Sequence, residues 1–354
     1  MDQASGEMVV DSNEADARLY NHTDQLLKAH ETLLSDANRN RPLYRALKKT
    51  VTKYSSVLDI GSGTGIWAVA AAKLGARRVV AIEEEVLLIG VIKDLAKENG
   101  VADRVEVIQG DSRRVQLGKE FDIVISETVG HLVFDESIAS IMIDARTRFL
   151  QSGGILIPET VSLVAAAARL KSRHEKLPAG IPMTHSSFQS LALNIPIGLN
   201  NKARLQLITD PQELVRADFG SISATPDLSN LTARWELPDA RQVNCFAVWA
   251  EITLIRGVRI TTRQTTSWFP MIYRIKPFEQ ERGEIEFRLA LTSKSNYWTA
   301  TLSKDQHQEV QSYSPAFAAA ELLAHARTET NVFSHQQRSG LTDILSNEDF
   351  AKIV

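Results

Sequence analysis

The stretch VLDIGSGTGIWAV, residues 57–69, decides the fold of this chain. Its first four residues are apolar except for Asp59 and predict a buried strand, whereas IWAV begins a helix. Between the two, Gly61, Gly63 and Gly65 form a turn that a ligand can approach closely, because glycine has no side chain. The stretch therefore predicts a strand, a ligand-binding loop and a helix in succession.

Around this stretch, short β-rich runs and helical runs alternate, which predicts a parallel sheet covered by helices. Beyond Pro158 the runs are β-branched and aromatic and are separated by polar turns, which predicts antiparallel strands. We expect an α/β, Rossmann-like domain followed by an antiparallel β domain. The expected organisation is a disordered tail at 1–15, the Rossmann-like domain at 16–157, the β domain at 158–302 and a helical extension at 303–354.

Composition argues against several kinds of partner. Among 354 residues, 40 basic and 43 acidic side chains give a net charge of −3, without a basic block for a phosphate backbone, so no direct nucleic-acid binding is expected. No run reaches the roughly 20 apolar residues of a membrane helix. Cys245 is the single cysteine, which favours the cytoplasm. The eight His show no CxxC or HExxH pattern, so no metal site is expected.

The spacing of the glycines distinguishes between cofactors. A dinucleotide fingerprint reads GxGxxG, whereas this loop reads GxGxG and follows Asp59, a residue that would repel a pyrophosphate but suits an amino-acid moiety. Glu83 ends the next strand, where it can accept hydrogen bonds from ribose hydroxyls. Asp111 ends the strand after that and could accept from the amino group of adenine. These features favour S-adenosylmethionine over a nicotinamide cofactor.

A second informative stretch is ISETVGHLVFDE, residues 125–136, which places Glu127 and Glu136 at the two ends of an apolar loop. A lone glutamate is usually a solvated surface charge, but the apolar residues between these two lower that expectation. A guanidinium is planar and has five donors, so two carboxylates can hold it while one nitrogen faces a methyl group. The pair predicts a cationic methyl acceptor.

Taken together, these motifs resemble those of the protein arginine methyltransferases, class I S-adenosylmethionine-dependent enzymes with a β-barrel domain. The segment 57–83 is similar to the family's cofactor motifs, and SETVGHLVFDES to its double-glutamate loop. QSGGILIPE, at 151–159, resembles the link into the barrel, and ITDPQELV, at 208–215, resembles a barrel strand. The resemblance covers roughly residues 20–302 in order.

The resemblance implies roles for particular residues. His30 and Arg39 match positions that contact the methyl donor, with Arg39 holding its carboxylate, and Glu127 and Glu136 match the two catalytic carboxylates. Arg113 stands where the family has a glutamate near adenine, so the adenine contact is assigned to Asp111 and the backbone of Ser112. The expected cofactor-binding residues are His30, Arg39, Asp59, Gly61, Gly63, Glu83, Asp111 and Ser112.

The residues expected to line the acceptor pocket differ from those of the family. Tyr20 is not followed by the second aromatic of the family's first helix, and Asp24 stands where another tyrosine is expected. The Thr-His-Trp loop occurs at 266–268 with Ser267 in place of the histidine that would pair with Asp36. We therefore expect a wider or more polar acceptor pocket. Its expected residues are Tyr20, Asp36, Ser267 and Trp268.

The sequence favours an N-methyltransferase that acts on the guanidino group of arginine in a protein or peptide. Two alternatives stay open: methylation of a small guanidino or amino compound, and a non-catalytic protein that binds the cofactor or a partner. An irregular segment at 179–206 matches, through the resemblance, a dimerisation arm, so a homodimer is expected. Its expected apolar contacts are Phe188, Leu191, Leu193, Ile195 and Ile197.

Overall fold

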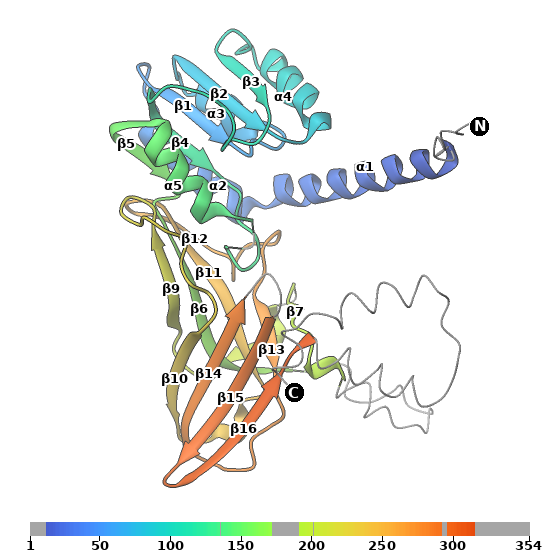
Figure 1. Ribbon diagram of the computed structural model, residues 1–354, viewed down its shortest axis with the longest axis vertical. Helices are drawn as coiled ribbons and strands as arrows, with labels where there is room; N and C mark the ends of the chain where they lie inside the picture. The colour runs from blue at the N-terminus through green and yellow to red at the C-terminus, as the bar shows by residue number, and fades with distance from the viewer. Residues whose placement is uncertain (1–11, 135, 172–190, 201, 292–295, 316–354) are drawn as a thin grey trace, which may run out of the picture.

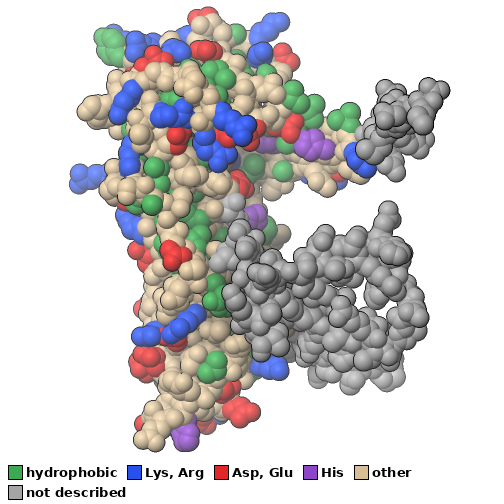
Figure 2. Space-filling model, viewed as in Figure 1, with side chains coloured by type: hydrophobic (Ala, Val, Ile, Leu, Met, Phe, Trp, Pro, Cys, Tyr) green, Lys and Arg blue, Asp and Glu red, His purple; other side chains and the backbone are tan. Residues whose placement is uncertain are grey.

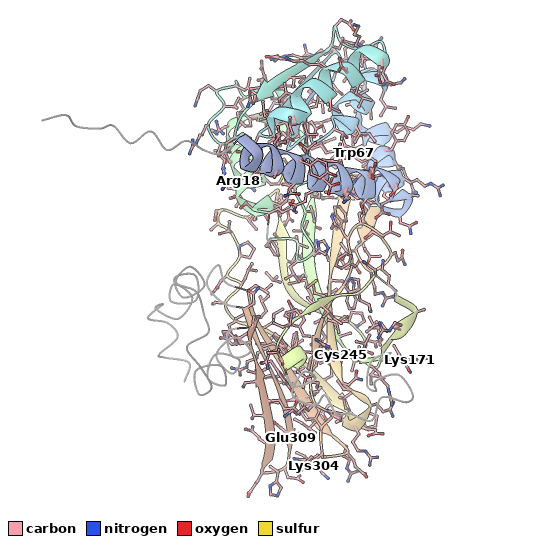
Figure 3. All side chains as sticks on the ribbon, turned by 90° about the vertical axis from the view of Figure 1, so that its right-hand side faces the viewer. Arg18, Trp67, Lys171, Cys245, Lys304 and Glu309 are labelled. Carbon is pink, nitrogen blue, oxygen red and sulfur yellow. The ribbon has the colours of Figure 1, made fainter. Side chains whose placement is uncertain are left out.

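A computed structural model describes residues 12–134, 136–171, 191–200, 202–291 and 296–315. The chain forms a domain with a parallel sheet and a domain of antiparallel strands, stacked along the long axis of the molecule (Figure 1). Helix α1 starts away from both domains and runs in to their junction, and the side view shows it crossing between them (Figure 3).

The first domain alternates strands and helices. Its elements are α1 (Ser12–Ser35), α2 (Ala37–Thr50), β1 (Ser56–Ile60), α3 (Ile66–Lys73), β2 (Arg78–Glu83), α4 (Val86–Glu98), β3 (Val105–Gln109), β4 (Phe121–Ser126), α5 (Ile138–Arg148) and β5 (Leu150–Ile157). The strands pair in the order β3-β2-β1-β4-β5, and all are parallel. The chain therefore changes direction across the sheet between β1 and β4, where open α/β sheets bind ligands at the carboxyl ends of their strands.

The second domain consists of strands, two of them very short, and two 3-10 helices labelled η1 and η2. Its elements are β6 (Thr160–Leu170), β7 (Ile197–Gly198), η1 (Lys202–Arg204), β8 (Leu205–Leu207), β9 (Gln212–Asp218), β10 (Leu231–Leu237), η2 (Ala240–Gln242), β11 (Cys245–Ile255), β12 (Val258–Thr261), β13 (Met271–Arg274), β14 (Gly283–Leu291), β15 (Asn296–Lys304) and β16 (His307–Tyr313). One antiparallel sheet has the order β10-β14-β15-β16, and a larger one contains β7, β13, β11, β6 and β8, with β12 on β11 and β9 on β6. The expected fold class, a Rossmann-like domain followed by an antiparallel β domain, is confirmed.

Both cores follow from the residue types of these strands. Strand β1 is buried along its whole length, as expected for a parallel strand covered on both faces. In the second domain Trp298, Phe287 and Phe246 pack inside the sheets, with 4.3 Å between the ring centroids of the last two. Cys245 is fully buried in a second, smaller cluster that includes Trp249, and burial raises the pKa of its thiol to about 12. It lies deep in the second domain (Figure 3).

Two sequence expectations about boundaries need correction. Residues 303–313 do not begin a helical extension, because β15 continues to Lys304 and β16 pairs with it as an edge strand. Alternating burial along β16 explains this, since a strand on a sheet surface buries every second side chain. At the other end, α1 begins at Ser12, inside the expected tail. Residues 1–11 and 316–354 lie outside the described part of the chain.

The described part of the segment 179–206 also differs from expectation. Leu193 packs on the protein's own large core and Ile197 on the smaller cluster around β11, whereas Ile195 is 42% exposed. Arg274 of β13 donates to the backbone carbonyl of Ala192 and so holds this segment against its own domain. Only Ile195 of the described arm residues is well exposed. Phe188 falls outside the described residues.

Candidate active site

A cavity of about 480 Å³ lies across the carboxyl ends of the parallel strands, within the size range of small-molecule sites. Gly61 follows β1, Glu83 ends β2, Asp111 follows β3 and Glu127 follows β4, and all four line this one cavity. Because the strand order is β3-β2-β1-β4, the cavity runs from Asp111 past Glu83 and the glycine loop to Glu127. The fold thus brings together residues that are far apart in sequence.

The glycine loop has the backbone conformation that its composition predicts. Gly61, Gly63 and Gly65 have φ values of +68°, +56° and +81°, which residues with a side chain rarely adopt. A Cβ atom at Gly61 would come within 2.5 Å of Thr128, and one at Gly63 within 2.9 Å of His30. The loop is therefore held close both to the β4 loop and to α1.

Asp59 lies behind this loop and not in the cavity. Its side chain is 1% exposed, and Oδ2 accepts the backbone N–H of Ala68 at 3.0 Å, at the start of α3. Burial raises the pKa of Asp59 to about 7, because the charged form loses its hydration. The expected direct contact with the cofactor is corrected: a carboxyl enclosed by β1 and α3 supports the loop from beneath.

Glu83 is placed as the sequence suggested, on the cavity wall at the end of β2. One carboxylate oxygen accepts the backbone N–H of Gly63 at 2.6 Å and the other that of Glu85 at 2.9 Å. These bonds fix the carboxylate beside the glycine loop. A carboxylate has about four acceptor positions, so two remain for hydroxyl groups of a ligand.

Helix α1 forms one side of the cavity near its carboxyl end. His30 lines the cavity beside the glycine loop, and burial lowers its pKa. Earlier in the helix, His22 pairs with Glu85 of the α4 N-cap at 2.8 Å. Tyr20, by contrast, is 70% exposed and does not line the cavity, so its expected place in the substrate pocket is not observed. Asp24 pairs with Lys28 on the helix surface at 2.7 Å.

Arg39 occupies the far end of the cavity, next to the two glutamates. Its guanidinium forms an ion pair with Glu127, and Glu136 lines the same cavity close enough to raise the pKa of Arg39. Burial acts more strongly in the opposite direction and lowers that pKa to about 10. The Arg39 guanidinium also lies over the ring of Trp268, 5.1 Å from its centroid.

Asp36 joins the two domains behind Arg39. Its Oδ2 accepts from the backbone N–H groups of Thr266 and Ser267 and from the Ser267 hydroxyl, at 2.7, 2.8 and 2.7 Å. Its Oδ1 caps α2 by accepting from Asn38 and Arg39. Burial opposes ionisation, but these hydrogen bonds outweigh it and lower the pKa of Asp36.

Ser267 thus donates a hydrogen bond to Asp36, in place of the histidine that the family has at this position. Asp36, Ser267 and Trp268 are all buried and do not line the cavity, so they support its wall instead of contacting a ligand in it. Beside them, Phe269 packs edge-on against His131 of the double-glutamate loop, with 4.0 Å between ring centroids. The Ser267 hydroxyl is engaged by Asp36, and the expected wider or more polar acceptor pocket stays a prediction.

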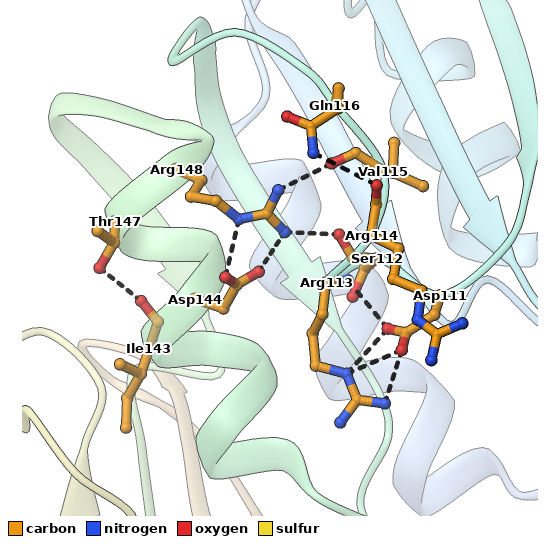
Figure 4. Close-up of polar contacts among 10 residues, drawn as sticks. All are labelled: Asp111, Ser112, Arg113, Arg114, Val115, Gln116, Ile143, Asp144, Thr147 and Arg148. Atoms are coloured by element: carbon orange, nitrogen blue, oxygen red, sulfur yellow. Dashed lines mark hydrogen bonds and ion pairs between the residues drawn. The ribbon is translucent and has the colours of Figure 1, made fainter.

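The opposite end of the cavity is formed by the loop after β3. Asp111, Ser112 and Arg113 line it, and Arg113 binds both carboxylate oxygens of Asp111 (Figure 4). Arg148 of α5 secures the loop, donating to the backbone carbonyls of Ser112 and Val115 at 2.7 and 2.8 Å. Sequence reasoning missed Arg148, because only the fold brings the last turn of α5 to this loop.

Three further findings concern surface charge, metal binding and membrane-spanning helices. On the face shown in Figure 2, Lys and Arg side chains are interspersed with Asp and Glu over both domains. Among the described residues, no cluster of His, Cys, Asp and Glu could hold a metal ion. None of the described helices has the length and apolar character to cross a membrane.

Comparison with known proteins agrees with the geometry. The family model for ribosomal protein L11 methyltransferase matches residues 43–169. A curated Arabidopsis thaliana relative, probable protein arginine N-methyltransferase 6, is 26% identical over 246 residues, which are 66% of this chain and 56% of the relative. The arginine N(omega)-methyltransferase of Streptomyces achromogenes subsp. streptozoticus is 28% identical over 273 residues, 72% of this chain and 73% of the relative.

Among solved structures, the Trypanosoma brucei PRMT1 enzyme–prozyme heterotetrameric complex with AdoHcy superimposes with a TM-score of 0.67 at 20% identity, covering 80% of this chain and 97% of that one. The chain shares the fold of this structure, a parallel-sheet domain followed by an antiparallel β domain. In sequence it is similar to the arginine N-methyltransferases named above, and it spans just over half the length of the Arabidopsis relative.

Proposed function

We propose that this protein is an S-adenosylmethionine-dependent methyltransferase that acts on a guanidinium, that of an arginine residue in a protein or peptide. The observation that carries the proposal is the ion pair of Arg39 with Glu127 beside Glu136. The two-carboxylate site already binds a guanidinium, supplied by the chain itself. The same charges and planar geometry suit an incoming arginine side chain.

The cavity also fits the methyl donor. Its volume and its glycine loop suit a nucleoside with an amino-acid tail, and Glu83 offers acceptor positions to ribose hydroxyls. S-adenosylmethionine supplies a methyl group on a sulfonium, which is already a good leaving group. Arg39 lies at the Glu127 end of the cavity and could exchange Glu127 for the donor's carboxylate, which would free Glu127 for the acceptor.

The residues of this site act mainly by alignment and charge. Complete deprotonation of a free arginine at pH 7 costs about 7 to 9 kcal/mol. Glu127 and Glu136 orient the guanidinium, raise the electron density of the attacking nitrogen and accept its proton as the new bond forms.

Glutamine substitution tests this role directly. Glu127→Gln and Glu136→Gln keep the shape of each side chain but remove the acceptor charge, and each is expected to slow methyl transfer about a hundredfold or more. Radiolabelled methyl transfer gives the rate, and calorimetry gives the donor affinity. Glu106→Gln, on the exposed side of β3 and paired with Arg78, is the matched control and should retain normal turnover. Normal rates in both site variants would refute the proposal.

A small guanidino compound is the second candidate acceptor, since the Streptomyces relative is named an arginine N(omega)-methyltransferase. Mass spectrometry of cell lysate incubated with the protein and labelled donor separates the two. We expect label in the protein fraction, on a guanidino nitrogen of arginine. Label confined to the small-molecule fraction would assign the second candidate instead.

Location and assembly complete the proposal. We place the protein in the cytoplasm, supported by its single cysteine, which is buried. We also expect a homodimer. The support for it is the exposed apolar surface of α4, where Val86, Leu87 and Val91 are 60%, 40% and 44% exposed.

A further inference from the structure

The loop after β3 forms the end of the cavity farthest from Glu127 and Glu136, and it carries the guanidinium of Arg113. Because the strand order is β3-β2-β1-β4, the acceptor carboxylate Glu127 lies at one end, Glu83 lies between, and Asp111 and Arg113 lie at the other end. If the proposed function holds, the ribose lies at Glu83 and the purine base lies at Arg113. This inference rests on that proposal.

Asp111 is not available to the base, because Arg113 binds it with a fork of hydrogen bonds. Arg113 Nε lies 2.9 and 3.1 Å from the two carboxylate oxygens, and Nη2 lies 2.8 Å from Oδ2. The backbone N–H of Arg113 donates to Oδ1 as well, at 2.9 Å. These bonds lower the pKa of Asp111, so the pair stays ionised and closed.

A backbone carbonyl of the same loop also accepts a hydrogen bond from an arginine. Arg148 donates to the carbonyl of Ser112 at 2.7 Å and is itself held by Asp144 at 2.6 Å (Figure 4). Of the groups that the sequence assigned to adenine, the Asp111 carboxylate and the backbone carbonyl of Ser112 therefore already have partners. Arg113 Nη1 has no hydrogen-bond partner within the part of the chain that the structure describes. The group in this loop that remains for a base is therefore the Arg113 guanidinium, which is a hydrogen-bond donor.

Purine bases differ in what they offer to such a donor. Adenine presents an amino group at position 6, which is itself a donor, whereas a 6-oxopurine presents O6 next to N7, two acceptors that a guanidinium binds as a pair. We propose that Arg113 reads the base of the methyl donor through its acceptor atoms. The site then does not select adenine by its amino group and binds a 6-oxopurine nucleoside donor at least as well.

Calorimetry with two ligands tests this on the full-length protein. S-adenosylhomocysteine and S-inosylhomocysteine differ at position 6 of the base, amino against oxo, and in the proton that the oxopurine carries on N1. We expect the wild-type protein to bind the inosine ligand at least as tightly as the adenine ligand, because Arg113 can donate to both O6 and N7 of the oxopurine but only to N7 of adenine. In Arg113→Glu, a carboxylate faces the base, so the adenine ligand should gain about tenfold over the inosine ligand.

Two further variants keep the test decisive. Arg113→Gln, whose amide pairs with the adenine edge, should shift the preference in the same direction even if Arg113→Glu folds poorly. Arg114→Glu makes the same change of charge at a neighbouring residue that does not line the cavity, and it should leave the ratio unchanged. A tenfold wild-type preference for the adenine ligand, or an unchanged ratio in both Arg113 variants, would overturn the inference. Absence of binding by S-adenosylhomocysteine would instead overturn the proposed function and the inference with it.

Discussion

At the scale of single residues, Asp59 illustrates how burial changes the chemistry of a carboxyl group. Its Oδ1 has no hydrogen-bond partner among the described residues, and its Oδ2 accepts the N–H of Ala68. Its pKa of about 7 lies far above the 3.8 of an ordinary aspartate, so the folded state holds the proton more tightly than the unfolded state. The resulting stabilisation is complete below pH 4 and is lost as the pH rises to about 7.

This linkage predicts how Asp59→Asn behaves. Asparagine keeps an acceptor for Ala68 and has no charge, so stability should depend less on pH between about 4 and 7. At pH 8 the variant should be more stable than the wild type by a few kcal/mol, at roughly 1.4 kcal/mol per unit of pKa shift. Thermal unfolding at pH 5 and pH 8 measures this. Asp103→Asn, at a side chain that is 77% exposed, is the control, and equal pH dependence in all three proteins would contradict the prediction.

At the scale of elements, one carboxylate couples the start of α2 to the loop at 265–268. Asp36 accepts two hydrogen bonds from α2 and three from the loop, so it both caps a helix and holds the second domain against the first. Arg39 belongs to the same helix and lies on Trp268 of the same loop. Displacement of this loop would therefore move the guanidinium that pairs with Glu127.

Two substitutions separate the helix cap from the hydrogen bonds that Asp36 accepts from the loop at 265–268. Asp36→Ala removes the cap and the clamp together and should lower the free energy of unfolding by about 3 kcal/mol, whereas Ser267→Ala removes one hydrogen bond to a charged group and should cost about 1.5 to 3 kcal/mol. Urea denaturation followed by tryptophan fluorescence reports both values. Ser140→Ala, which loses a hydroxyl that bonds within α5, should change stability little. A Ser267→Ala variant as stable as the Ser140→Ala control would show that the clamp contributes nothing.

At the scale of the whole molecule, the exposed surface of α4 predicts association with a second copy. Leu87 and Val91 are four residues apart and so lie on one face of the helix. Light scattering at micromolar concentration should give twice the mass of the chain, and Leu87→Glu should shift the protein toward the monomer. Val310→Glu alters an apolar residue on β16 that is 60% exposed, and this variant should stay dimeric. A monomeric wild-type protein would refute the expected homodimer.

The local sequence determined the elements that depend on neighbouring residues. Residues 57–69 specify a strand, a glycine turn and a helix, because strand burial and positive φ angles are decided by the side chains at those positions. The strand ends likewise placed Glu83, Asp111 and Glu127 on one edge of the sheet, since parallel strands present their carboxyl ends together.

Tertiary structure decided which of these side chains are available to a ligand. Asp59 precedes the glycine loop in sequence but is enclosed by β1 and α3, and Asp111 is engaged by Arg113. Arg39 reaches Glu127 only because α2 packs beside the end of β4, across 88 positions of the chain. Burial and pairing depend on groups brought together from distant parts of the sequence. A motif can therefore name a residue type, but only the folded chain determines its partners, its exposure and its charge.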